Sequence, residues 1–288
     1  MVTLFGRQLG GEMNRSLLRS FAGSAFLIVC VATQAIVYRH DRTDAQMLAF
    51  GAESQFLGVG QLWVGGGFGT GTFIGYGNGS AWLLTAKHVI DTGDTGTFAF
   101  ANGDSFAVTD AFGLAGVDIS VAKISGWTLN VFAPTLNMDP ITGGTFVRSA
   151  GYGGSGRAGT QPPGGWVYDD QRRGMETKIA GLYPSGEIHD IFDSPTSPDV
   201  TNMEGFGAPG DSGSALVTSA GVALGVLTGG QFEAYGNSNW YATLTAEQSR
   251  IIYAHTGIDP NPVPEPASMV ALSLGALAVL RRRKRASS

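Results

Sequence analysis

The sequence predicts an all-β protein, organised as a pair of small antiparallel barrels with one helix at the end. Two observations carry this prediction. The 288 residues include 44 glycines, which separate short apolar runs in the way that tight turns separate strands. Only one segment, close to the C-terminal end, combines helix-capping signals with apolar contacts. Roughly 220 residues of short antiparallel strands suit two barrels.

The N-terminal residues have the pattern of a secretory signal peptide. Arg15 and Arg19 precede an apolar run at residues 21–31, and the small residue Ala35 follows it. We therefore predict that residues 1–35 direct export and are removed by signal peptidase. The alternative is a buried helix at the N-terminus.

Composition excludes several classes of function. The net charge of −5 gives no sign of a basic surface for nucleic acid. The single cysteine, Cys30, lies inside the predicted signal, so we expect the exported chain to hold no disulfide and no thiolate metal site. We expect no cofactor and no metal; a Ca²⁺ site at an acidic turn such as residues 190–193 stays open, because that turn matches no specific motif. Met13 is an alternative start, since the residues before it add nothing that a signal needs.

Alternation and turn residues predict the strands of the working part of the chain. Residues 71–86 form a strand pair that turns at the Asn-Gly pair 78–79, and residues 97–109 form another that turns at the Asn-Gly pair 102–103. Both turn sequences tolerate positive φ, as two-residue hairpin loops require. Two later runs continue the alternation: 144–153 and 214–230.

The predicted helix lies near the end of this part. Thr245 can cap its N-terminus, and Gln248 stands three residues later, as in a capping box. Ile251 and Ile252 supply apolar contacts, and Gly257 ends the helix.

The C-terminal tail, residues 258–288, contains three features in order. A Val-Pro-Glu-Pro sequence at 263–266 is followed by an apolar run at 269–280 and a basic run at 281–285. The apolar run is shorter than the roughly 20 residues that cross a bilayer as a helix. The tail resembles the PEP-CTERM sorting signal of Gram-negative bacteria. That resemblance implies transient membrane association, processing by an exosortase, and release to the cell surface, outer membrane or extracellular matrix; the alternative is an ordinary C-terminal anchor.

A candidate nucleophile lies in the sequence GAPGDSGSAL. A serine hydroxyl needs a base to remove its proton and donors to stabilise the oxyanion that follows. Here the backbone N–H groups of Gly210 and Ser212 can point at one place, and Gly213 allows a substrate carbonyl to approach. Taken alone, the motif is also compatible with an ordinary Gly/Ser loop.

The base and its orienting acid have one best pair of candidates. His88 follows the apolar run AWLLTAK, where a strand can hold it firmly, whereas His40 and His255 lie near the ends and His189 has no nucleophile nearby. Asp118 lies in GVDISVAKI, which we interpret as a charge within an apolar strand, costly to bury unless it is paired. A histidine after a strand can also be purely structural.

The motifs TAKH, GVDIS and GDSG, in the order His–Asp–Ser, resemble those of the chymotrypsin-like (trypsin-fold) serine proteases. Subtilisin-type enzymes and α/β-hydrolases place the three residues in other orders. The resemblance implies two antiparallel six-stranded β-barrels, at 36–140 and 141–257, with the active site between them and a C-terminal helix.

The resemblance also implies a role for each residue. Ser212 is the expected nucleophile, His88 the general base and acid, and Asp118 the group that orients the histidine. The N–H groups of Gly210 and Ser212 form the oxyanion hole. The usual disulfides of the family are absent, as the single cysteine requires.

Cleavage after Ala35 would leave Ile36-Val37 at the mature N-terminus. In activated members of the family such a terminus inserts inward, and its ammonium pairs with the acid before the nucleophile, here Asp211. Signal peptidase would then create the active form directly. The alternative is that Ile36 begins an ordinary strand and Asp211 bonds only to local backbone.

The resemblance places four residues around the substrate. Phe206 stands six positions before the nucleophile, at the base of the specificity pocket, where the lack of an acid argues against a preference for Arg or Lys; we expect small or apolar side chains to fit. Thr228, Gly229 and Gly230 lie along the substrate backbone, and Gly229, where a large aromatic is common, would leave this edge open. Lys87 replaces a usual small residue and is expected to face solvent.

The sequence therefore predicts an exported serine endopeptidase that hydrolyses peptide bonds through an acyl-enzyme. Its partners would be protein or peptide substrates, signal peptidase and an exosortase, with no nucleic acid. One alternative is a catalytically weak or inactive protease fold that binds partners at the surface or in the matrix. Another is a structural β-rich matrix protein with a chance GDSG motif.

Overall fold

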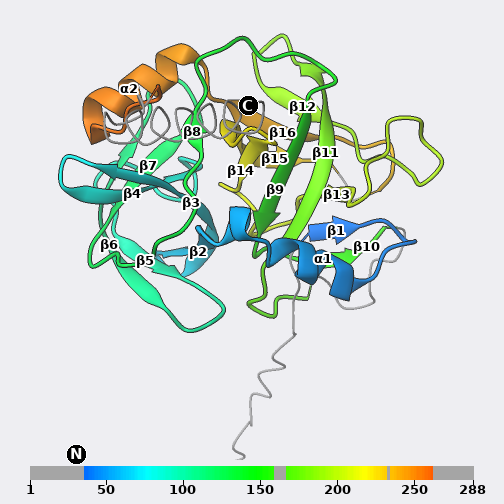
Figure 1. Cartoon of the computed structure of the whole chain (residues 1–288), viewed down its shortest axis with the longest axis horizontal. Coiled ribbons are helices and arrows are strands. Elements are labelled where there is room, and N and C mark those ends of the chain that lie inside the picture. The colour runs from blue at the N-terminus through cyan, green and yellow to red at the C-terminus, as the bar shows by residue number, and fades with distance from the viewer. Residues whose placement is uncertain (1–35, 159–166, 232–233, 262–288) are drawn as a thin grey trace, which may run out of the picture. The chain divides into compact units, whose positions relative to one another are not determined.

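The computed structural model describes residues 36–158, 167–231 and 234–261, and it confirms the all-β prediction. Two closed barrels lie side by side, with the first drawn in cyan and green and the second in green and yellow (Figure 1). The predicted signal peptide and the sorting tail lie outside the described residues.

The first barrel closes in the order β2-β3-β4-β7-β6-β5, with every neighbouring pair antiparallel. Its strands are β2 (Val59–Val64), β3 (Gly67–Gly77), β4 (Ser80–Thr85), β5 (Gly96–Ala99), β6 (Ser105–Gly113) and β7 (Ser120–Ile124). Both predicted hairpins are confirmed, since β3 turns into β4 at residues 78–79 and β5 turns into β6 around 102–103. Asn78 and Gly79 both have positive φ, as this turn demands.

β4 is buried along nearly its whole length, because its two faces meet two different cores. Leu83 packs inside the first barrel with Phe98. Leu84 faces the other way, into a cluster that includes Val226 of the second barrel and Ile252 of the C-terminal helix. The strand that carries the predicted general base at its end is therefore fixed from both sides.

The second barrel is also six-stranded and antiparallel. Its order is β14-β9-β11-β12-β16-β15, and the pairing of β15 with β14 closes it. The strands are β9 (Phe146–Gly151), β11 (Arg173–Leu182), β12 (Ile188–Asp190), β14 (Ala215–Thr218), β15 (Val222–Gly230) and β16 (Asn239–Thr243). The short β8 (Thr135–Leu136) adds to β15 in parallel.

The N-terminal segment packs on the second barrel, although the first barrel follows it in the chain. β1 (Ile36–Tyr38) lies between β10 (Ser155–Arg157) and β13 (Gly205–Phe206) in a small sheet. Next come helix α1 (Asp44–Gly51) and a 3₁₀ turn, η1 (Ser54–Phe56). The fully buried Arg173 of β11 forms ion pairs with Asp44 and Asp169, which tie α1 to the second barrel.

The C-terminal helix α2 (Ala246–Thr256) confirms the predicted capping pattern. Thr245 and Gln248 form a capping box, and Gly257 ends the helix in the left-handed conformation. The helix packs against the first barrel, where a Cβ on Gly77 would lie only 2.2 Å from the Thr256 carbonyl oxygen. Figure 1 shows α2 beside β4 and β7.

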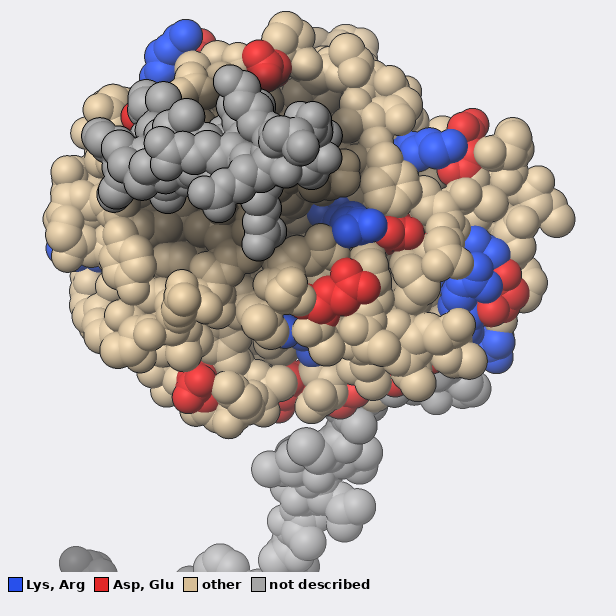
Figure 2. Space-filling model, viewed as in Figure 1, with Lys and Arg blue, Asp and Glu red and all other residues tan. Residues whose placement is uncertain are grey.

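Charged side chains of both signs are interspersed among neutral ones on the face drawn in Figure 2. Within the described residues no helix is both long and apolar enough to cross a membrane.

Candidate active site

His88 lies in the turn that follows β4, and Asp118 holds it by two hydrogen bonds. The His88 backbone N–H donates to Asp118 Oδ1 over 2.9 Å, and the ring Nδ1 lies 2.7 Å from Asp118 Oδ2. A carboxylate on Nδ1 keeps the proton there and leaves Nε2 able to accept one. The side chain of His88 is 45% exposed, so the ring can meet a substrate.

Asp118 is not part of a strand, and our interpretation of its place was wrong in this respect. It lies in the turn between β6 and β7, which a hydrogen bond from Leu114 N to Ile119 O closes. Partial burial raises the pKa of Asp118, but the hydrogen bonds from the His88 ring and backbone outweigh it and bring the pKa below its ordinary value. The carboxylate therefore stays charged at neutral pH.

Ser212 lies in the loop between β13 and β14, pressed against the first barrel. The next residue, Gly213, has a φ of 88°, and a Cβ there would lie 2.1 Å from Thr85 Oγ1. Only glycine fits this position, which sets the serine beside the strand end that leads to His88. Within the described residues the Ser212 hydroxyl makes no hydrogen bond to the His88 ring. Catalytic contacts of this kind commonly tighten when a substrate binds.

The backbone around Gly210 leaves two N–H donors available. Gly154 N donates to the Pro209 carbonyl over 2.7 Å. Because a trans peptide unit is planar, the N–H of Gly210 points away from that carbonyl. Within the described residues neither Gly210 N–H nor Ser212 N–H has an acceptor. Two unpaired donors in one loop can stabilise an oxyanion.

The carboxylate of Asp211 is buried at the centre of this loop. It accepts hydrogen bonds from the backbone N–H groups of Gly153 (2.7 Å), Ala208 (2.9 Å) and Ile36 (3.3 Å). Burial raises its pKa to about 6, although these three hydrogen bonds lower it. A Cβ at Gly151 would lie 2.1 Å from Asp211 Oδ1, so the glycine makes room for the carboxylate.

Ile36 and Val37 fill the space behind the serine loop. Ile36 is 2% exposed and has a φ of 60°, which is unusual for a β-branched residue. Val37 packs in one cluster with Phe206 and Ala208. The segment predicted to form the mature N-terminus thus reaches the acid predicted to receive it.

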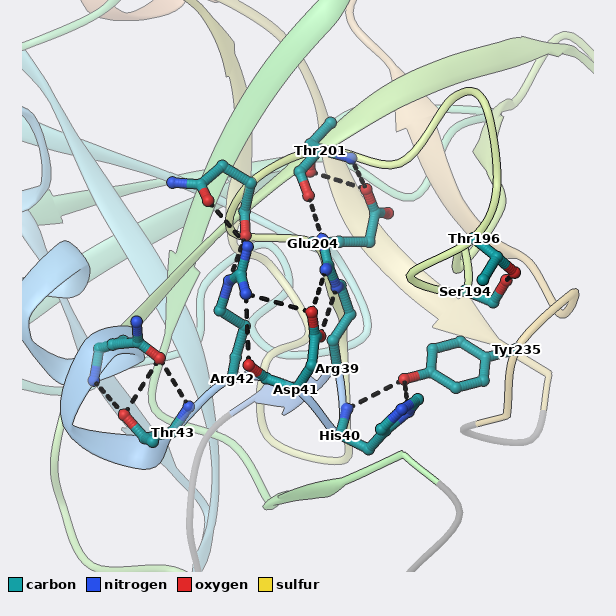
Figure 3. Close-up of polar contacts among 12 residues, drawn as sticks. Arg39, His40, Asp41, Arg42, Thr43, Ser194, Thr196, Thr201, Glu204 and Tyr235 are labelled. Atoms are coloured by element: carbon teal, nitrogen blue, oxygen red, sulfur yellow. Dashed lines mark hydrogen bonds and ion pairs between the residues drawn. The ribbon is translucent and has the colours of Figure 1, made fainter.

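The residues after β1 anchor this segment to neighbouring loops (Figure 3). Arg39 donates to the Thr201 carbonyl over 2.7 Å, and Arg42 donates to the Asn202 carbonyl over 2.8 Å. On the other side, His40 N–H donates to the Tyr235 hydroxyl over 2.9 Å. Two guanidinium–carbonyl hydrogen bonds on one side and a hydrogen bond to a tyrosine hydroxyl on the other therefore hold β1 in place.

Glu204 holds Thr201, the residue whose carbonyl accepts from Arg39, as Figure 3 also shows. Its Oε2 accepts from Thr201 N (3.0 Å) and Thr201 Oγ1 (2.7 Å), while Oε1 is buried and has no hydrogen-bond partner in the part of the chain that the structure describes. Burial raises the pKa of Glu204 to about 7, against these hydrogen bonds, and the nearby charge of Asp190 raises it further.

A small pocket of about 150 Å³ opens beside Ser212. Its walls come from the serine loop and β15: Gly207, Ala208, Pro209, Ser212, Leu227, Gly229, Gly230 and Gln231. Phe206 is fully buried behind the wall, with its ring 3.1 Å from where a Gly230 Cβ would stand. Asn239 of β16, which sequence reasoning missed, places its Oδ1 2.7 Å from the same point. These two side chains therefore lie behind the Gly230 wall of the pocket rather than lining it.

At the expected substrate edge, Gly229 is partly exposed and Gly230 is exposed. Trp240 of the neighbouring strand occupies the space where a side chain of Gly229 would stand, with Nε1 2.7 Å from the position of such a Cβ. Thr228 Oγ1 donates to the Trp240 carbonyl over 3.2 Å. Lys87 is half-exposed and lies 3.8 Å from Asp91, as expected of a residue that faces solvent.

Two solved structures share this fold. A mutant of human heparin binding protein aligns over 74% of this chain and 97% of its own, with 15% identity and a TM-score of 0.54. A Glu endopeptidase in complex with MPD aligns over 80% of this chain and 100% of its own, with 17% identity and a TM-score of 0.51. The fold is that of the chymotrypsin-like serine proteases.

The sequence goes further than the fold. Residues 69–226 match the model of the trypsin-like peptidase domain, a stretch that spans more than half of the chain and contains His88, Asp118 and Ser212. The chain belongs to the family of trypsin-like peptidase domains. A comparison with curated proteins gives no match.

The tail carries a second signature. Residues 262–285 match the PEP-CTERM protein-sorting motif, which confirms the resemblance seen in the sequence. This motif indicates export and sorting toward the cell surface of a Gram-negative bacterium.

We predict that Glu204→Gln flattens the pH dependence of stability. Folding raises the pKa of Glu204 from 4.5 to about 7, so the folded state binds more protons than the unfolded state between these values. Stability from this group is therefore greatest below the lower value and falls as the pH rises toward the upper one. Urea unfolding at a series of pH values should show a shallower fall in the variant. Glu53→Gln, at an exposed position, serves as control and should follow the wild type; an unchanged profile in Glu204→Gln would contradict the prediction.

Proposed function

We propose that this protein is an exported serine endopeptidase in which His88, Asp118 and Ser212 form the catalytic triad. The observation that carries the proposal is the doubly hydrogen-bonded pair of Asp118 and His88. A carboxylate that binds both the ring and the backbone of one half-exposed histidine gives it a fixed tautomer at the edge of the serine loop. Membership of the trypsin-like peptidase family supports peptide bonds as the substrate.

Each step of the reaction has a group in the site. Ser212 Oγ attacks the peptide carbonyl while His88 Nε2 accepts the hydroxyl proton, and the N–H groups of Gly210 and Ser212 bind the resulting oxyanion. His88 then gives the proton to the leaving amine, and an acyl-enzyme remains. Water, deprotonated by His88, cleaves the acyl ester and restores Ser212.

A fluorophosphonate probe tests this proposal directly. It should label Ser212 in the wild type and leave Ser212→Ala unlabelled, because the probe needs an activated hydroxyl. Asp118→Asn should fold normally and lose roughly 10⁴-fold in kcat, since the tautomer of His88 is no longer fixed. A folded wild type that is neither labelled nor active on peptides would favour the alternative, a protease fold that serves binding at the surface.

The geometry around Asp211 supports activation by signal peptidase. The N atom of Ile36 already lies 3.3 Å from Asp211 Oδ2 in the chain with residues 1–35 attached. Cleavage after Ala35 would convert that amide into an ammonium, which pairs with a buried carboxylate far more strongly. The pairing would lower the pKa of Asp211 and fix the serine loop without a separate activation step.

Chains that begin at Ile36 and at Ala35 should therefore differ in activity. We expect the first to be at least about tenfold more active, because a single ion pair with a buried partner is worth more than ~1.4 kcal/mol. Asp211→Asn should abolish this difference by removing the partner, and N-terminal acetylation of the Ile36 chain should reproduce the loss. Equal activity of the two chains would show that Ile36 only begins a strand.

The pocket beside Ser212 supports a preference for small side chains at the residue before the cleaved bond. Phe206 and Asn239 lie directly behind its Gly230 wall, and most of the residues that border its volume of about 150 Å³ are glycines or apolar. Among the described residues no acidic side chain lines it to attract Arg or Lys.

A peptide library should reveal this preference. We expect Ala or Ser before the cleaved bond to give rates roughly 10-fold or more above Phe, Leu or Arg, the usual worth of a steric mismatch in a pocket. Phe206→Ala should shift the preference toward larger apolar side chains by removing the ring behind the Gly230 wall. Preferred cleavage after a large residue by the wild type would rule out this view of the pocket.

The two terminal signals support a route to the cell surface. Signal peptidase would remove residues 1–35, and an exosortase would process the tail near its Val-Pro-Glu-Pro sequence at 263–266. The tail would associate with the membrane only transiently. The substrates would then be proteins or peptides outside the inner membrane.

A further inference from the structure

Thr70 is a residue of the first barrel that bonds to both Gly210 and Ser212, whose N–H groups form the proposed oxyanion hole. It is fully buried on β3, a strand that otherwise contributes to the core of the first barrel. Its backbone N–H donates to the Ser212 carbonyl over 2.8 Å. Its hydroxyl donates to the Gly210 carbonyl over 3.0 Å. No other residue among those described bonds to the carbonyl groups of both Gly210 and Ser212.

The Thr70 hydroxyl is itself oriented by its surroundings. Tyr152 N–H donates to Thr70 Oγ1 over 3.3 Å, so the hydroxyl proton is directed to the Gly210 carbonyl. Thr85 Oγ1 donates to the Thr70 carbonyl over 2.8 Å and braces the backbone from β4. The hydroxyl thus has one donor and one acceptor, both in fixed positions.

Gly210 needs such a restraint more than its neighbours do. Its φ of 97° lies in a region where glycine moves freely, and it has no side chain of its own to hold it. One side of the residue is fixed, because the Pro209 carbonyl accepts from Gly154 N–H. On the other side, Thr70 Oγ1 holds the Gly210 carbonyl. With both flanking peptide planes fixed, the Gly210 N–H has a single direction.

We propose that the Thr70 hydroxyl is a positioning group that holds Gly210 with its N–H directed at the developing oxyanion. The inference rests on the proposed peptidase function for its effect on rate, but its structural part, the restraint of the loop, does not. Thr70 does not touch the reacting atoms and acts only through Gly210. The first barrel would then supply the orientation of the oxyanion hole as well as the base and its acid.

β3 offers a matched control. Thr72 lies two residues further along the strand, on the same face, and is also buried, but its Oγ1 has no hydrogen-bond partner among the described residues. Thr70→Val and Thr72→Val each replace a hydroxyl by a methyl group of similar size. Thr70→Ser keeps the hydroxyl and should restore function.

Kinetics test the effect on catalysis. We expect Thr70→Val to lower kcat roughly 10- to 100-fold with little change in KM, less than the loss of an oxyanion donor itself. Binding of a peptide aldehyde, which forms a tetrahedral oxyanion, should weaken by a similar factor, while binding of the product peptide stays unchanged. Thr72→Val should match the wild type, and Thr70→Ser should recover to within about threefold. A wild-type kcat and aldehyde affinity in Thr70→Val would overturn the proposal.

Amide hydrogen exchange tests the restraint independently of turnover. In a Ser212→Ala background, residues 207–214 should exchange faster with Thr70→Val than with Thr72→Val, because the loop opens more often. Equal exchange in the two variants would overturn the role of Thr70 while leaving the peptidase function intact. A wild type without turnover or probe labelling, but with the expected difference in exchange, would instead overturn the function and leave the restraint standing.

Discussion

The burial of the Asp211 carboxylate is the constraint on which the serine loop depends. A buried carboxylate needs hydrogen-bond donors in place of water, and here three backbone N–H groups supply them, one from the serine loop itself and two from distant parts of the chain. Their convergence requires glycine at position 151, where any side chain would meet the carboxylate. It also draws the loop into the tight turn that presents Ser212. A single buried acid thus determines where Ser212 stands.

Three consecutive N–H groups that follow β9 of the second barrel also hold the serine loop in place. Those of Tyr152, Gly153 and Gly154 donate in turn to the Thr70 hydroxyl, the Asp211 carboxylate and the Pro209 carbonyl. The segment therefore bonds to one side chain of the first barrel, to one side chain of the serine loop and to the backbone of that loop. Hydrogen bonds from one short segment thus tie the serine loop to both barrels.

Much of the fold was predictable from local chemistry, because Asn-Gly turns and a capping box act within a few residues. The pairing of His88 with Asp118 was predictable from motif order, since each residue lies in its own short signature. The surroundings of the pocket were not: Asn239 and Trp240 come to lie beside its Gly229 and Gly230 wall through the register of β15 with β16, which shifts between Leu227 and Gly229. Thr70 gave no signal, because a threonine in a strand is ordinary. Helix α1 was also missed; its apolar residues have almost no helical periodicity, and contacts with β11 stabilise it.

Each end of the described chain packs on the barrel that is more distant from it in the sequence. The arm that precedes the first barrel, β1 with α1, lies on the second, and the helix that follows the second barrel lies on the first. Each barrel is thus covered by a segment that adjoins the other barrel in the sequence. The barrels can separate only if both segments detach. The two predicted processing sites adjoin these two segments in the sequence. Maturation would therefore cleave the chain close to the places where the two barrels are held together. Processing at these two sites would in this way be coupled to the assembly of the two barrels.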